Sequence, residues 1–132
     1  MHTLKWCQDS NSMSMKRMTA LQDVEDLVGE IKERIVSDGL LYMNKLAKNA
    51  QTLADLGITS QRQREIIDSI VPEDYCGGPD PDEKYPWKFV AVFGKDIGGT
   101  ELYIKFSVGM TGTPVVCLSF HEADYPMPYQ FK

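Results

Sequence analysis

The sequence predicts one α+β domain in which a helical N-terminal half packs on one face of a C-terminal antiparallel sheet. Apolar residues recur at helical spacing as far as residue 70, and their spacing changes to two after residue 86. A segment rich in proline and glycine separates the two halves. At 132 residues, with 42% hydrophobic and 25% charged residues, the chain has the size and composition of a single globular domain.

Residues 1–18 show no periodicity and are interpreted as a flexible leader before a single domain over residues 19–132. The leader lacks the basic start and apolar stretch of a secretory signal. No apolar run approaches the ~18 to 20 residues that cross a bilayer. We therefore expect a cytoplasmic protein without membrane contact.

The first of three helices expected within residues 19–71 begins at Thr19, because Thr19 and Gln22 match a capping box. Gly39 supplies its stop signal. Acidic residues near its start and basic residues near its end complement the helix dipole. Its expected buried residues are Leu21, Val24, Leu27, Val28, Ile31 and Ile35.

The second helix is expected over about residues 41–56, with Gly57 after its end. The third helix begins behind Thr59 or Ser60 and ends before Pro72. Apolar residues at helical spacing are expected to face the sheet from both helices. They are Leu46, Ala50, Leu53 and Leu56 in the second helix, and Ile66, Ile67 and Ile70 in the third.

Residues 72–86 contain four prolines and two glycines, so this segment is interpreted as a loop without regular structure. The sheet is expected within residues 87–121. The tail over residues 122–132 is rich in proline and aromatic residues and is interpreted as an irregular flap. The three expected strands are residues 87–93, 101–108 and 115–120.

Side chains alternate between the two faces of a strand, and the apolar set must face the helices. This set comprises Phe89, Ala91 and Phe93, then Leu102, Ile104, Phe106 and Val108, and finally Val116, Leu118 and Phe120. Cys117 is expected on the opposite face. That opposite face is expected to gather Lys88, Tyr103, Lys105, Ser119 and His121.

A face that carries lysine, tyrosine and histidine suits cleavage of an RNA phosphodiester without a metal. His121 is the candidate acid or base, because imidazole titrates near neutral pH. Lys105 would hold the phosphate as a point charge, and Tyr103 would orient the phosphate or stack on a base. Attack by a ribose 2′-hydroxyl then yields a 2′,3′-cyclic phosphate.

We expect no cofactor and no metal site, since three separated cysteines and two histidines provide too few ligands. A metalloenzyme that uses Cys76, Cys117 and His121 is a weaker alternative. Cys117 and His121 would lie on one side of a strand about 13 Å apart, at ~3.3 Å per residue. One zinc ion does not span that distance.

Several segments of the C-terminal half match a known family in their wording: VPEDY, VAVFGKDIGG, ELYIKFSV and VVCLSFHEADYPMPY. The sequence from about residue 53 to residue 129 resembles the MqsR (motility quorum-sensing regulator) toxins, mRNA endonucleases with a RelE-like fold. The resemblance implies an α+β ribonuclease that is the toxin of a type II toxin–antitoxin pair. Its substrate would be mRNA, and its partner a cognate antitoxin protein.

Carried over by position, Tyr103 falls on the family's strand tyrosine and Lys105 on the lysine two residues later. His121 stands where the best-known members have lysine after Ser-Phe. Cys76 stands where the archetype has a functional lysine, and Val90 where it has glutamine. The residues that we expect to contact the RNA are Lys88, Lys95 and Ser119.

A non-catalytic interaction module on the same fold is the alternative function. The formal net charge of −5 and the two departures from the family pattern favour it. The open sheet face or the sheet edge would then bind a protein partner. Its candidate anchors are Tyr75, Tyr85, Trp87, Tyr125 and Tyr129.

Overall fold

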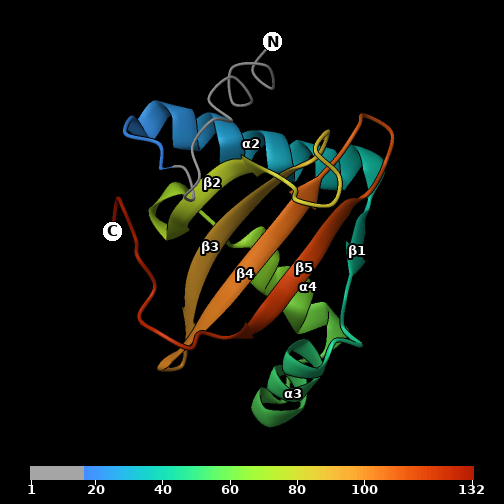
Figure 1. Ribbon diagram of the computed structural model, residues 1–132. Helices are drawn as coiled ribbons and strands as arrows, with labels where there is room; N and C mark the ends of the chain where they lie inside the picture. The colour runs from blue at the N-terminus through green and yellow to red at the C-terminus, as the bar shows by residue number, and fades with distance from the viewer. Residues whose placement is uncertain (1–16) are drawn as a thin grey trace.

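The computed structural model describes residues 17–132 and confirms the α+β class, with two helices lying behind a sheet that faces the viewer in Figure 1. The sheet has five strands in the order β1-β5-β4-β3-β2. The C-terminal strands are antiparallel as predicted, whereas the unpredicted β1 runs parallel to β5, so the whole sheet is mixed. The elements are α2 (Leu21–Asp38), β1 (Leu40–Tyr42), α3 (Ala47–Leu56), α4 (Ser60–Asp68), a 3-10 turn η1 (Pro72–Asp74), β2 (Tyr75–Pro81), β3 (Phe89–Ile97), β4 (Thr100–Val108) and β5 (Val115–Glu122).

Both outer strands lie where no strand was predicted. β1 occupies the start of the segment predicted as the second helix, and α3 begins only at Ala47. Pairing of Leu40–Tyr42 with β5 overrides the local helical pattern there. β2 lies within the segment predicted to be a loop, and its pairing with β3 is interrupted by two register shifts. Prolines are compatible with β2 because it is an edge strand.

The two helices behind the sheet are α2 and α4, and they form the core together with the sheet. α2 buries Val24, Leu27, Val28, Ile31 and Ile35 as predicted, while Leu21 is exposed. The capping box at Thr19 is wrong, because Ala20 is the N-cap and no side chain caps the helix. In α4 the predicted cap at Thr59 is confirmed, since its hydroxyl oxygen accepts the Arg62 N–H at 3.1 Å. Its apolar contacts Ile66, Ile67 and Ile70 are buried as predicted.

The sheet contributes one apolar face to this core. The predicted inward residues of β3 and β4 are buried, as is Phe120 of β5. In β5, however, Lys105 pairs with Ser119 while Phe106 pairs with Cys117, so Leu118 is an extra residue in a bulge. A bulge reverses the side-chain alternation beyond it. The predicted burial of Val116 and Leu118 is therefore wrong, and Cys117 lies in the core rather than on the opposite face.

The face of α3 toward the sheet is polar, although an apolar face was predicted. Asn49 and Thr52 are buried, whereas Ala50 and Leu46 are exposed. Leu53 and Leu56 are half-buried against the main core. The helix lies beside the end of β5 in Figure 1.

The first described residues meet the C-terminal tail beside β2. Of the predicted leader, residues 1–16 lie outside the described residues, while Arg17 and Met18 are held in place. The Arg17 guanidinium donates to the Pro128 carbonyl oxygen at 2.8 Å, and the Met18 N–H donates to the Tyr75 hydroxyl at 2.9 Å. Gln130 bonds to both Arg17 and Met18. Both residues that were assigned to the leader and are described therefore bond to β2 or the C-terminal tail.

Within residues 17–132, no helix is long and apolar enough to cross a membrane.

The close approach of β2 to β3 requires a glycine at position 78, and this requirement can be tested. This residue has a φ of 94°, and a Cβ there would lie 2.5 Å from the Val90 carbonyl oxygen. We expect Gly78→Ala to lower the free energy of unfolding by about 3 kcal/mol, from positive φ and overlap together. Urea denaturation measures this loss.

Gly98→Ala is the matched control for that variant. Gly98 also has a positive φ, of 62°, but its Cβ would meet nothing within 4 Å. Its expected loss is only about 1 kcal/mol. Equal losses at the two positions would contradict the close approach of β2 to β3.

Candidate functional site

The sheet face opposite the core, here called the open face, carries Tyr103, Lys105, Ser119 and His121. Tyr103 and His121 lie directly opposite each other on β4 and β5. Their rings stack with centroids 5.2 Å apart and an angle of 11° between the planes. The structure thus brings together two of the three predicted catalytic side chains in direct contact.

Lys105 and Ser119 form the next pair along the same two strands. Lys105 therefore lies on the same face as Tyr103, two residues further along β4. Among residues 17–132 its side chain has no hydrogen bond and no ion pair. Its ammonium group is free to bind an anion above the open face.

Two polar side chains of α3 hold β5 in position beneath this site. β1 pairs with β5 only as far as Cys117, so β5 has no neighbouring strand on that side from residue 118 onward. The Asn49 amide group donates to the Leu118 carbonyl oxygen at 3.0 Å, and its carbonyl oxygen accepts the Phe120 N–H at 2.9 Å. The Thr52 hydroxyl accepts the Glu122 N–H at 2.9 Å. These bonds replace a missing strand and fix the bulge that orients His121.

The backbone also fixes the tautomer of His121. Its Nδ1 lies 2.9 Å from the Glu122 carbonyl oxygen. A carbonyl oxygen only accepts hydrogen bonds, so Nδ1 carries the hydrogen. In the neutral ring Nε2 then has the lone pair and is available to take a proton.

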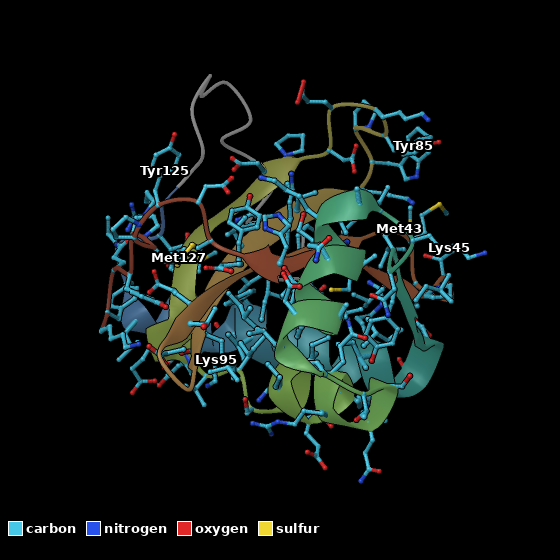
Figure 2. The ribbon with its side chains drawn as sticks, turned by 90° about the horizontal axis from the view of Figure 1, so that it is seen from below. Met43, Lys45, Tyr85, Lys95, Tyr125 and Met127 are labelled. Atoms are coloured by element: carbon cyan, nitrogen blue, oxygen red, sulfur yellow. The ribbon has the colours of Figure 1, made fainter. Side chains whose placement is uncertain are left out.

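The C-terminal flap, residues 123–132, forms one wall of a groove on the open face. The groove has a volume of about 460 Å³. Figure 2 shows Tyr125 standing above the sheet on this flap and Met127 lying below it. The groove is lined by Lys48, Cys76, Val92, Tyr103, Ser119, His121, Asp124, Tyr125, Pro126, Met127 and Pro128, so Lys105 lies just outside it.

The flap is fastened to the sheet at several points. Glu101 of β4 accepts the Ala123 N–H through its backbone oxygen and the Met127 N–H through its carboxylate, each at 2.8 Å. Further along, the Tyr129 ring lies on Gly94, where a Cβ would come within 2.6 Å of the Tyr129 hydroxyl oxygen. Met127 packs with Cys76 and Val92 as the apolar floor of the groove.

The charged groups of the groove are paired. Lys48 at the start of α3 and Asp124 of the flap lie 2.6 Å apart. This hydrogen bond, together with the positive charge of Lys48, lowers the pKa of the Asp124 carboxyl. Desolvation raises the pKa of Tyr103, so its hydroxyl keeps its proton near neutral pH and acts as a donor.

Two of the predicted RNA contacts lie away from this site. Lys95 is on the core side of the sheet, where its ammonium group pairs with Asp74 at 2.9 Å, and Figure 2 shows it on the opposite side from Tyr125. Lys88 lies before β3, with its ammonium group 4.9 Å from the Tyr85 ring centroid. It is four residues from Val92, about 13 Å along the strand. Neither lysine lines the groove that contains His121, whereas Ser119 does.

The cysteines do not form a common site with the histidine. Cys76 lies under the groove, while Cys117 lies in the core on the other side of the sheet. The bulge in β5 is the reason, because it turns Cys117 away from the face that carries His121. Within the described residues, no three His, Cys, Asp or Glu side chains are close enough to hold a metal ion.

Sequence reasoning missed the pair of Lys48 and Asp124 and the supports from Asn49 and Thr52. The first pair is separated by 76 residues, and neither member belongs to a recognisable motif. For Asn49 and Thr52 a signal was available, because these two polar residues interrupt the apolar spacing of the predicted second helix.

No protein-family model, curated protein or solved structure matches this chain.

Removal of the Asn49 side chain tests the support beneath the site. We expect Asn49→Ala to lower the free energy of unfolding by about 3 kcal/mol, because the buried polar groups of Leu118 and Phe120 lose their partner. Gln51→Ala is the matched control on the exposed side of α3, where Gln51 bonds only to Asp55. It should change stability by less than about 0.5 kcal/mol. Equal effects in urea denaturation would contradict the proposed support.

The two buried thiols provide a second test. Burial raises the pKa of Cys76 and of Cys117 to about 12. Thiolate is the reactive form, so only about one thiol in ten thousand is ionised at pH 8. In a Cys7→Ser variant, we expect almost no reaction with a disulfide reagent in the native state and two reactive thiols in denaturant. Rapid native reaction would show that the groove floor is open.

Proposed function

We propose that this protein is a metal-independent endoribonuclease that cleaves mRNA. The single observation that carries the proposal is the stacked pair of Tyr103 and His121, with the free ammonium group of Lys105 two residues along the same face. A base, a hydrogen-bond donor and a cation on one sheet face are the groups that 2′-hydroxyl attack on a phosphodiester requires.

The fixed tautomer of His121 defines the first step. Nε2 of the neutral ring takes the proton from a ribose 2′-hydroxyl, and the 2′-oxygen forms a bond to phosphorus. The bond between phosphorus and the 5′-oxygen then breaks, the leaving oxygen takes a proton from a water molecule, and the His121 imidazolium returns its proton to the resulting hydroxide. The products carry a 2′,3′-cyclic phosphate and a 5′-hydroxyl.

Lys105 and Tyr103 stabilise the charge that develops on the phosphate. The ammonium group supplies a full positive charge, and the protonated hydroxyl of Tyr103 supplies a hydrogen bond. Neither group has a hydrogen-bond partner among residues 17–132. Both are therefore available to the substrate without first breaking an internal interaction.

The resemblance to the MqsR toxins supports the same proposal. We infer that the protein is the cytoplasmic toxin of a type II pair, that its fold is RelE-like, and that a cognate antitoxin protein neutralises it. At one of the departures from that family, the thiol of Cys76 is buried and stays protonated, so it cannot replace a lysine. At the second departure, Val90 has no polar group that could replace the glutamine of that family. The reaction here must rest on His121, Lys105 and Tyr103.

Cleavage of a defined messenger RNA in EDTA tests the mechanism. We expect His121→Asn to lower the rate by about 10² to 10⁴, the usual contribution of a general acid or base. Lys105→Met should also lower it, whereas Lys45→Met, which removes the same charge from an exposed position beside β1, should not. The products should end in cyclic phosphate and 5′-hydroxyl groups. Cleavage that needs a metal ion, or cleavage of DNA, would contradict the mechanism.

The non-catalytic module remains the second candidate because large apolar side chains are exposed. Trp87 is 62% exposed and Met110 is 66% exposed beside a wide groove at α2. Of the other predicted anchors, Tyr75 is fully buried and is excluded. Stable binding of a protein partner by His121→Asn and wild type alike, with no RNA cleavage by either, would favour this candidate.

A further inference from the structure

Tyr125 is an exposed aromatic side chain that the fold holds in one place. It is 82% exposed, the highest value among the large apolar side chains of residues 17–132. Large aromatic rings usually stabilise a protein by being buried in its core, but Tyr125 is not part of the core. It instead lines the groove that also contains His121 and Tyr103.

The residues around Tyr125 are anchored on both sides. Asp124 is paired with Lys48 at 2.6 Å, and the Met127 N–H donates to Glu101 at 2.8 Å. Pro126 follows directly and restricts the backbone of Tyr125 to extended conformations. The short backbone segment that carries the ring is therefore held at both ends, and only two side-chain torsions of Tyr125 remain to be ordered on binding.

The groove beside this ring suits a flat apolar ligand. Its floor is formed by Met127, Val92 and Cys76, which pack as one apolar cluster. Its volume of about 460 Å³ lies in the range of small-ligand pockets, roughly 300 to 1,000 Å³. Its only described carboxylate, Asp124, is neutralised by Lys48, so repulsion of a nucleotide is small.

From these observations we propose that Tyr125 is the stacking platform for an unpaired nucleobase next to the cleaved phosphate. The inference rests on the proposed function, which places the phosphate over His121 and Lys105. The ligand class is single-stranded RNA with one base turned out into the groove, because a duplex keeps both faces of each base covered. Tyr125 is a binding residue and takes no part in proton transfer.

Binding of a short single-stranded RNA with 2′-O-methyl riboses tests the inference separately from cleavage. Affinity is measured by fluorescence anisotropy, and stacking by quenching of 2-aminopurine placed at each position in turn. We expect Tyr125→Ala to bind roughly 5- to 150-fold more weakly and to lose the quenching, whereas Tyr125→Phe keeps both. With unmodified RNA, Tyr125→Ala should raise KM by a similar factor and leave kcat nearly unchanged.

Tyr85→Ala is the matched control, since Tyr85 is another exposed tyrosine on the same side of the sheet (Figure 2). Equal weakening by Tyr85→Ala and Tyr125→Ala would overturn the inference, and so would wild-type affinity in Tyr125→Ala while RNA is still cleaved. RNA binding that depends on Tyr125 without any cleavage would retain the stacking site and overturn the endonuclease proposal. Absence of RNA binding by the wild type would overturn both.

Discussion

The bridge that the Asn49 side chain makes between α3 and β5 is the constraint on which the site depends. β1 is only three residues long, so the lower half of β5 would have an unpaired backbone edge without this helix. A buried carboxamide satisfies one donor and one acceptor there, and it does so where an extra residue enters the strand. Because the bulge reverses the alternation of β5, the same contact that completes the edge also sets which β5 side chains reach the open face. The position of His121 opposite Tyr103 is thus a consequence of a hydrogen bond made on the far side of the strand.

The second half of the site comes from the C-terminal flap, which is attached to the same strand that carries Tyr103. Glu101 binds the flap through both its backbone and its side chain, two residues before Tyr103 on β4. Arg17, Met18 and Gln130 tie the flap's far end to the start of the described chain beside β2. One wall of the groove is therefore the sheet, and the other wall is the flap, which is hydrogen-bonded to the rest of the protein at several points. Such a wall can present an exposed ring in a defined place without any regular secondary structure.

The features that depend on local sequence spacing were predicted correctly from the sequence. The buried stripe of α2, the Thr59 cap of α4 and the alternation of β4 all follow from spacing or from a single capping side chain. The failures have a common origin in long-range pairing. β2 was hidden by its prolines and glycines, β1 by the helical pattern around it, and the bulge at Leu118 by a strand sequence that alternates without interruption. A bulge is fixed by partners on α3 and β4 and has no signature in its own strand, so the parity of β5 was predicted correctly only from Ser119 onward. The cluster of Tyr103, Ser119 and His121 was predicted correctly because it lies beyond that point.

The distribution of charge makes the proposed binding of RNA by this face compatible with a formal net charge of −5. The carboxylates of α2 line a separate groove with Trp87 and Met110, at the other end of the sheet from His121. On the open face, Lys105 is free among the described residues, and the carboxylate of Asp124 is cancelled by Lys48. Few phosphates can be neutralised by so small a number of cations, so counterion release would supply little of the affinity of the proposed complex. Under the proposal, the binding energy comes instead from close contacts in the groove, with one phosphate over Lys105 and with a base against an aromatic ring. The proposed recognition thus depends on shape and stacking at a single nucleotide step, and it requires a substrate that reaches the groove as an unpaired strand.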